Sequence, residues 1–294
     1  MNPQTATRQP GTGTPATPTR KQLLQAVPVR ERTLSLAGIS TPILEGGTGQ
    51  PVILLHGPGG NAFHWMSLIP GLVRTHRVIA PDLPGHGASQ VNDGPLDQHR
   101  VVRWLDELID VTAGEAPIVV GAALGGAIAL LYASQKNRIG RLILLGSMGL
   151  APFEPTPEFG AALHQFLGRP TPETQEALWK ECVYDLAELR TALGANWSAF
   201  DGYNLDRALS PEVMASLMQL MELFGLPAIP PRDLEKIRVP TRLVWGRHDR
   251  AIPLGVARTA SERYGWPLQV IEDAGADLAL ENPAAVAAAI DGTF

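Results

Sequence analysis

The sequence predicts an α/β fold in which a mostly parallel central sheet is flanked by helices on both faces and carries a helical cap as an insertion. Apolar, β-branched runs alternate with segments of helical spacing up to about residue 150 and again after residue 237, a pattern typical of repeated β-α units. Between these parts, helical segments separated by prolines replace the alternation. At 294 residues, the chain is long enough for one domain with such an insertion.

The N-terminal part contains an expected tail and the first strands. Residues 1–28 are rich in Thr, Pro and Gly and offer little to bury, so we expect a disordered tail. Residues 29–36 alternate apolar and polar side chains and residues 41–44 follow a turn, which predicts two antiparallel strands at a sheet edge. Residues 51–55 form an apolar run before a glycine-rich loop, as expected of a buried parallel strand.

The next segments continue the alternation of strands and helices. Apolar residues at helical spacing predict a helix over 65–73, and a second, amphipathic helix is expected over 101–109. Between them, residues 77–80 have the composition of a short buried strand.

The stretch after residue 117 is the most informative part of the chain. Residues 116–135 carry no charge and are long enough to span a membrane, but their glycines and the change from strand to helix favour a buried strand followed by a buried helix. Gly121 and Gly125 have the spacing of the G-x-S-x-G nucleophile elbow, a strained turn in which larger side chains would clash. Ala123 stands where that motif has its serine.

The remaining segments complete the predicted domain. We expect a core formed by residues 29–150 and 237–294, and a helical cap over residues 151–236. The strands expected after the central stretch are 141–146, 241–245 and 268–271, and the helices expected in the cap are 159–167, 174–193 and 211–224.

Composition limits the possible partners and cofactors. The net charge of −5 and the pI near 5.8 provide no basic stripe for nucleic acid. A single cysteine, Cys182, and the lack of an apolar leader segment favour a cytoplasmic protein, and no membrane partner is expected. No ligand spacing for a metal appears, and no Lys-Ser/Thr follows Gly57, Gly59 and Gly60, so neither a metal nor another cofactor is expected. The oligomeric state stays open.

Five motifs follow one another in a characteristic order. They are His56-Gly57-Pro58-Gly59-Gly60, PDLPGHG at 81–87, GAALGG at 121–126, WGRHD at 245–249, and DAGA at 273–276 followed by Glu281-Asn282-Pro283. Together they resemble the α/β-hydrolase fold superfamily, in particular its capped, esterase-like and C–C hydrolase-like members, over roughly residues 29–292. The resemblance implies that position 123 is the nucleophile, Asp249 the acid and position 276 the histidine of a catalytic triad.

The chain departs from that pattern at two of the three positions. Serine becomes a nucleophile when an imidazole takes its proton, and a buried carboxylate orients that imidazole. Here Ala123 and Ala276 occupy the nucleophile and histidine positions, and a methyl group can neither attack a carbonyl nor move a proton. The oxyanion hole is also altered: Leu124 follows the nucleophile position, but Pro58 has no N–H, so Gly59 would have to replace it.

Three functions are compatible with these residues. The first is a protein of serine-hydrolase ancestry that acts on or binds a small apolar ester or carbonyl compound and is inactive as a Ser-His-Asp hydrolase. The second is a ligand-binding pseudo-hydrolase. The third is a cofactor-free, non-hydrolytic enzyme that uses Asp249 or a loop histidine as its base; His56 and His86 are expected beside the pocket, although such histidines are more often hydrogen-bonded turn residues.

The origin of the alanines has two explanations. They could be engineered replacements or the result of natural divergence, and Pro58 together with the retained acid favours divergence. Without an imidazole partner, a buried Asp249 should be solvated, protonated, or paired with Arg247 or Arg250, whereas a carboxylate with no donor in reach would favour engineering.

Some cap residues are also ambiguous. Cys182 is expected to fill space rather than to react. The large apolar side chains of the cap fit either a cavity wall or the contact between cap and core, and we favour the core for Phe166, Trp179, Met218, Met221 and Phe224.

Overall fold

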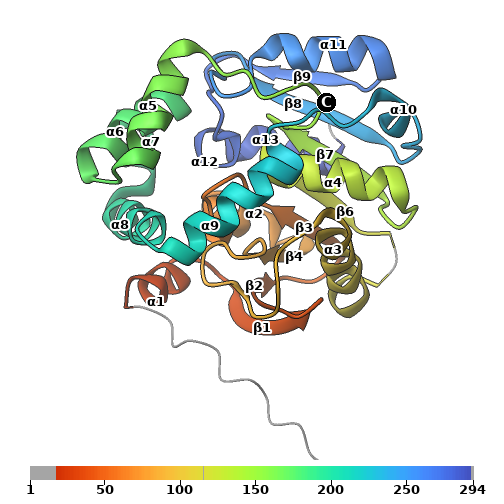
Figure 1. Cartoon of the computed structure of the whole chain (residues 1–294). Helices are drawn as coiled ribbons and strands as arrows, with labels where there is room; N and C mark the ends of the chain where they lie inside the picture. The colour runs from red at the N-terminus through yellow and green to blue at the C-terminus, as the bar shows by residue number, and fades with distance from the viewer. Residues whose placement is uncertain (1–17, 115, 293–294) are drawn as a thin grey trace, which may run out of the picture.

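A nine-stranded sheet forms the centre of the computed structural model, which describes residues 18–114 and 116–292 (Figure 1). The strands follow the order β1-β2-β4-β3-β6-β7-β8-β9, and the short β5 pairs with β2. The pairings from β4 through β3, β6, β7 and β8 to β9 are all parallel. The strands are β1 (Arg30–Leu36), β2 (Ile39–Gly46), β3 (Gln50–Leu55), β4 (His76–Pro81), β5 (Gln90–Val91), β6 (Ile118–Ala122), β7 (Arg141–Leu145), β8 (Thr241–Gly246) and β9 (Leu268–Ile271). The predicted α/β class with a mostly parallel sheet is confirmed.

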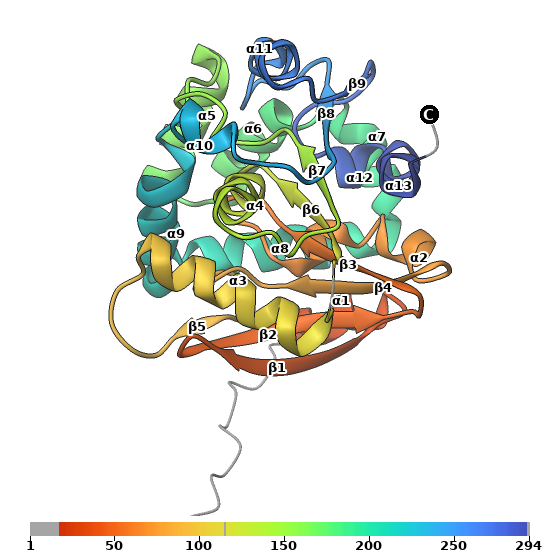
Figure 2. The ribbon, with the colours of Figure 1, turned by 90° about the vertical axis from the view of Figure 1, so that its right-hand side faces the viewer.

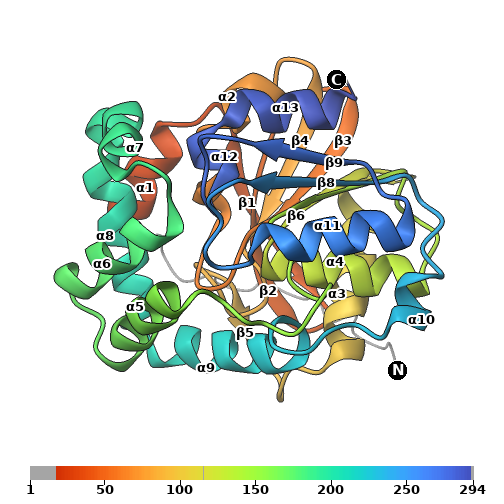
Figure 3. The ribbon, with the colours of Figure 1, turned by 90° about the horizontal axis from the view of Figure 1, so that it is seen from above.

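Helices cover both faces of this sheet. Figure 3 shows α2 (Ile69–Leu72) and α13 (Pro283–Asp291) on one face and α3 (Gln98–Thr112), α4 (Leu124–Gln135) and α11 (Leu254–Tyr264) on the other. Successive residues of a central strand point to opposite faces, so both faces need apolar side chains. Val52 and Leu54 pack in one hydrophobic core, whereas Ile53 and Leu55 pack in the other. This explains the apolar run over residues 51–55.

The two antiparallel strands lie where the sheet begins. β1 is the edge strand, and β2 pairs antiparallel with both β1 and β4. Figure 2 shows the sheet seen from its side, with β1 at the bottom and β9 at the top. Of the two strands expected at the sheet edge, β1 is the edge strand and β2 lies inside the sheet.

A long helical insertion, residues 146–240, connects the neighbouring strands β7 and β8. Figure 1 shows most of its helices as a separate layer to the left of the sheet. Its helices are α5 (Pro157–Gly168), α6 (Pro172–Cys182), α7 (Leu186–Leu193), α8 (Trp197–Ala208), α9 (Pro211–Leu220) and α10 (Pro231–Leu234). Proline occupies the first turn of several of them, where its missing N–H has no helical partner anyway.

Local capping explains where the expected helices differ from the observed ones. The helix expected over 174–193 is divided, because the Asp185 carboxylate accepts hydrogen bonds from Ala187 N and Glu188 N and begins α7 there. The helix expected over 65–73 is reduced to a short 3₁₀ turn, η1 (Ala62–Trp65), which Asn61 caps, and the single turn α2. Helix α8 was not anticipated from the sequence.

The expected N-terminal tail is too long. Residues 1–17 lie outside the described residues, but helix α1 (Pro18–Gln25) packs against α8 of the insertion. Leu23 is fully buried, and Arg20, also buried, forms an ion pair with Asp82 at 2.9 Å. Arg20 also donates a hydrogen bond to the Tyr203 hydroxyl at 2.8 Å. The packing of α1 could not be predicted from its composition, because a buried ion pair anchors it instead of an apolar stripe.

The membrane alternative for residues 116–135 is wrong. These residues form strand β6, a tight turn and helix α4. Among the residues that the structure describes, no helix has the length and apolar character needed to cross a membrane.

Candidate functional site

The turn between β6 and α4 has the strained geometry expected of a nucleophile elbow. Ala123 adopts φ 43° and ψ −109°, a conformation that residues with a side chain rarely take. A Cβ atom on Gly121 would lie 2.6 Å from the Cα of Gly126, and one on Gly125 would lie 2.3 Å from the carbonyl oxygen of Leu55. Glycine is therefore required at both flanking positions, and the elbow is preserved without its serine.

Backbone hydrogen bonds hold Ala123 at the carboxyl edge of the sheet. Its N–H donates to the carbonyl oxygen of Leu145 at 3.0 Å, and its carbonyl oxygen accepts from Met148 N at 3.1 Å. A Cβ on Gly57 would lie 3.6 Å from the Cβ of Ala123, so the glycine-rich loop passes directly beside the elbow.

Asp249, in the loop after β8, is buried and only half satisfied. Its Oδ1 accepts hydrogen bonds from Ala251 N at 3.0 Å and from Ile252 N at 2.8 Å. Its Oδ2 has no hydrogen-bond partner within the described part of the chain. Burial raises the pKa of Asp249 to about 7; the two backbone N–H groups oppose this shift, and the nearby Asp277 and Glu281 add to it.

Pairing with Arg247 or Arg250, one of the three alternatives for Asp249, is not what the structure shows. Arg247 donates to the carboxylate of Glu272 at 2.6 and 2.8 Å. Arg250 donates to the carbonyl oxygen of Lys180 at 2.8 Å and to Glu181 at 3.3 Å. Of the three alternatives for Asp249, partial protonation is the one that its raised pKa supports.

Ala276 approaches Gly146, the residue that also borders the free oxygen of Asp249. Its N–H donates to the carbonyl oxygen of Cys182 at 2.7 Å. A Cβ on Gly146 would lie 2.8 Å from Oδ2 of Asp249 and 3.9 Å from the carbonyl oxygen of Ala276. Ala123, Gly146 and Ala276 line one cavity; Asp249 does not line it but contacts Gly146. The structure thus brings the three positions 123, 249 and 276 to the same end of the sheet.

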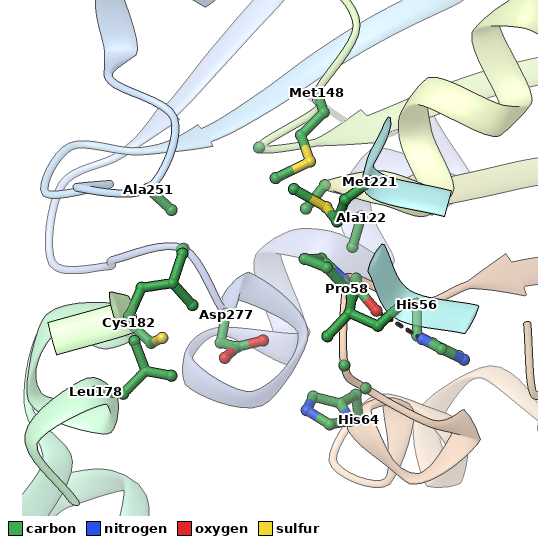
Figure 4. A pocket seen from close by; sticks show the side chains of 18 of the residues that line it. His56, Pro58, His64, Ala122, Met148, Leu178, Cys182, Met221, Ala251 and Asp277 are labelled. Carbon is green, nitrogen blue, oxygen red and sulfur yellow. Dashed lines mark hydrogen bonds between the residues drawn. The ribbon is translucent and has the colours of Figure 1, made fainter. Parts of the chain in front are cut away.

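The cavity between the sheet edge and the helical insertion has a volume of about 310 Å³ and a mostly apolar wall (Figure 4). Met218 and Leu226 line it and are also 52% and 46% exposed. Phe166, Trp179, Met218 and Met221, which we interpreted as core, line the cavity as well, whereas Phe224 is buried in the core. Apolar spacing alone does not distinguish a cavity wall from a filled core.

Asp277 is the charged cavity residue that the sequence reasoning missed. It follows Ala276 directly, and Figure 4 shows its carboxylate directed into the cavity between Cys182 and His64. Burial raises its pKa to about 6. The signal available in the sequence was a carboxylate next to a predicted site position and followed by the apolar run Leu278-Ala279-Leu280.

The expected loop histidines are poorly placed as catalytic bases. His56 lines the cavity, but its Nδ1 donates to the carbonyl oxygen of Gly57 at 2.8 Å and its Nε2 accepts from Leu83 N at 2.9 Å, so no lone pair is free. His86 is not among the residues around the cavity, which corrects that expectation; its Nδ1 bonds the carbonyl oxygen of Pro84 instead. Burial lowers the pKa of His86 to about 4 and lowers that of His56 well below its usual value.

Of the two residues expected to form the oxyanion hole, Gly59 lines the cavity and Leu124 is buried. Leu124 is the first residue of α4, immediately after Ala123. Pro58 and Gly59 both line the cavity, and Gly59 has φ +68°, a conformation that favours glycine. Pro58 supplies no N–H.

We also considered a cysteine nucleophile and a metal ion at this site. Burial and the surrounding carboxylates raise the pKa of the Cys182 thiol well above its usual value, which disfavours a thiolate nucleophile. Within the described ranges, no group of three or more His, Cys, Asp or Glu side chains could hold a metal ion.

Comparison with known proteins shows what the chain is similar to. Residues 52–289 match the alpha/beta hydrolase family. A 2-hydroxy-6-oxo-6-(2'-aminophenyl)hexa-2,4-dienoic acid hydrolase from Metapseudomonas resinovorans is 31% identical over 239 residues, which cover 77% of each chain. A 2-hydroxy-6-oxo-6-phenylhexa-2,4-dienoate hydrolase from Comamonas testosteroni is 30% identical, with 71% of this chain and 75% of the relative covered. The solved structure of the hydrolase of the same name from Rhodococcus sp. strain RHA1 superposes with a TM-score of 0.78, at 26% identity, over 90% of this chain and 98% of that one.

Proposed function

Because the chain belongs to the alpha/beta hydrolase family, we propose that it binds a small apolar ester or carbonyl compound without hydrolysing it by the Ser-His-Asp route. In this proposal, residues 29–150 and 237–294 form the core, residues 151–236 form the cap, and the cavity beside Ala123 holds the ligand. The single cysteine of the chain supports a reducing, cytoplasmic location as part of the same proposal.

The observation that carries the proposal is the pair of methyl groups at the elbow and beside Asp249. Ala123 occupies the central position of the strained turn, and Ala276 lies near Gly146, which borders the free carboxylate oxygen; both alanines line the cavity. Neither side chain can attack a carbonyl carbon or transfer a proton. Losing both the serine and the histidine of a triad lowers turnover by about a million-fold.

Divergence from an active hydrolase explains the remaining features. The names of the relatives describe hydrolases of dienoic acids, which supports a C–C hydrolase-like ancestor. Asp249 is kept in place by two backbone N–H groups, so it can remain after its imidazole partner is lost. Because these donors reach the carboxylate, the condition that would favour an engineered origin is not met.

A cofactor-free enzyme is the second candidate, with a different base from the one expected. Asp249 does not line the cavity, and both ring nitrogens of His56 are occupied. Asp277 lines the cavity and has a pKa of about 6, close to the value that suits a general base at neutral pH. If a base acts in this cavity, we infer that it is Asp277.

Two variants of the chain test the main proposal. The unchanged protein and an Ala123→Ser/Ala276→His variant are assayed with p-nitrophenyl esters of increasing acyl length. We expect background rates from the unchanged protein, saturable binding of an uncleaved apolar ester analogue by both proteins, and turnover from the double variant. Rapid ester hydrolysis by the unchanged chain would overturn the proposal, and so would the absence of binding by both proteins.

A further inference from the structure

The carboxylate of Asp277 faces the cavity without a partner from the protein. Within the described ranges, it accepts no hydrogen bond and forms no ion pair, and only burial shifts its pKa. Ionised carboxylates in enclosed surroundings are normally paired or hydrogen-bonded, because desolvation is costly. Figure 4 shows the carboxylate directed into the space between Leu178 and Cys182 on one side and Pro58 and His64 on the other. A ligand with a donor group in this space could therefore pair with a carboxylate that no protein group of the described ranges engages.

The described wall of the cavity contains no lysine and no arginine. The ionisable residues that line it are Asp277, Cys182 and two histidines, His56 and His64. Burial lowers the pKa of His64 to about 4 and that of His56 well below its usual value, so both rings are neutral at physiological pH. The carboxylate is thus the one charge among the described lining residues.

Neighbouring carboxylates make the electrostatic potential around Asp277 more negative. Asp249 and Glu281 lie close enough for the Asp277 charge to raise the pKa of each. Glu281 is held by the N–H groups of Tyr184 at 2.6 Å and Gly275 at 3.0 Å, which add no positive charge. Arg247 and Arg250, which lie next to Asp249 in the sequence, are engaged with Glu272 and Glu181. This end of the cavity is therefore acidic.

We propose that Asp277 selects the ligand by charge: the cavity takes an apolar molecule that carries an ammonium group and rejects one that carries a carboxylate. The proposal rests on the proposed ligand-binding function and narrows its ligand class. An ammonium group beside Asp277 forms a charge-assisted hydrogen bond and relieves the unpaired carboxylate, whereas a second carboxylate is repelled in surroundings that screen charges poorly. The cavity thus lacks the cation that would hold an acid such as those named for the relatives.

Three ligands with one apolar body test this selection. 4-Phenylbutylamine, 4-phenylbutanol and 4-phenylbutanoate are titrated into the unchanged protein by calorimetry at about pH 8, where an alkylamine is protonated and both carboxyl groups are ionised. We expect the amine to bind most tightly and the acid most weakly, with Kd values at least roughly 100-fold apart. The alcohol should fall between them.

Two matched variants locate the effect. Asp277→Asn keeps the shape of the side chain and removes its charge, so the amine should lose its advantage over the alcohol. Asp273→Asn removes an exposed carboxylate four positions away that does not line the cavity, and it should leave all three Kd values unchanged. This control separates selection inside the cavity from attraction by the net charge of −5.

The outcomes distinguish this inference from the proposed function. If the alcohol binds but the amine and the acid bind equally well, or if Asp277→Asn keeps the preference, charge selection is overturned while the binding function stands. If none of the three ligands binds, both are overturned.

Discussion

The free oxygen of Asp249 faces the backbone of Gly146: a Cβ atom on this glycine would lie 2.8 Å from Oδ2. Gly146 is the first residue after β7, has φ +46°, and lines the cavity. The space between these two residues is therefore just wide enough for a carboxylate whose other oxygen is fixed by Ala251 N and Ile252 N.

Gly146→Ala should therefore destabilise the protein by about 2–3 kcal/mol, because the methyl group meets Oδ2 and an alanine would have to adopt a left-handed conformation. The control is Gly202→Ala in helix α8, where a Cβ meets no atom within 4 Å and alanine should stabilise the helix by roughly 0.5–1 kcal/mol. Urea denaturation of both variants gives the two free energies. If Gly146→Ala lowers the free energy of unfolding by less than about 0.5 kcal/mol, as a typical surface substitution does, the Asp249 carboxylate is able to move away from position 146.

Asp249→Asn should remove part of the pH dependence of stability. The pKa of Asp249 is raised from 3.8 to about 7, so between these values the folded protein keeps a proton that the unfolded chain has released. Titration of Asp249 thus leaves the free energy of unfolding unchanged below pH 3.8, the pKa in the unfolded chain, and lowers it increasingly as the pH rises towards 7. Asparagine keeps an oxygen for Ala251 N and Ile252 N without this titration.

The measurement is the difference in unfolding free energy between Asp249→Asn and the unchanged protein, taken at about pH 5 and about pH 8. The variant should gain relative to the unchanged protein at the higher pH, by on the order of 2 kcal/mol. Asp277 and Glu281 also have raised pKa values and act on Asp249 through their charges, so the difference contains the titration of Asp249 together with its coupling to these two groups. A difference that is independent of pH would mean that Asp249 is ionised throughout.

The parallel sheet and the elbow could be predicted because backbone requirements leave direct traces in the sequence. The two faces of β3 require the apolar run 51–55, and the contacts of Gly121 and Gly125 exclude every larger side chain. Such constraints act within a few residues. The helix expected over 65–73 was wrong although its cause is also local, because Asn61 begins a 3₁₀ turn over 62–65 and the apolar spacing gave no sign of this cap.

Contacts between distant segments could not be predicted. Asp277 lines the cavity that forms between the insertion and the sheet edge, and its position directly after Ala276 was only a weak local sign of that arrangement. His56 and His86 have the same residue type and both lie in loops, but only His56 reaches the cavity, and its hydrogen bond from Leu83 N depends on the loop after β4. The arginine partners proposed for Asp249 bind other carboxylates for the same reason.

Arg20→Met should destabilise the protein by about 3 kcal/mol or more. Arg20 is buried, pairs with Asp82 and donates to the Tyr203 hydroxyl, so its loss leaves a buried carboxylate without its cation. The matched control is Arg30→Met, whose side chain is 79% exposed and approaches Glu45 only at 3.9 Å, with an expected change below roughly 0.5 kcal/mol. Guanidinium denaturation compares the two. Equal effects would show that α1 adds little to the contact between the sheet and α8.

Restoring the two missing side chains should restore a triad that depends on Asp249. In Ala123→Ser/Ala276→His, an imidazole beside Oδ2 gives the carboxylate its cation and gives the serine its base. Each single variant should stay at background, because a serine without a base and an imidazole without a nucleophile do not form an acyl-enzyme. Adding Asp249→Asn to the double variant should lower kcat for p-nitrophenyl butyrate by about 10⁴-fold, since the imidazole loses its orientation and its partner charge. If the double variant is active and Asp249→Asn leaves its kcat unchanged, a different group orients the new histidine, and the convergence of positions 123, 249 and 276 on one reaction centre is disproved.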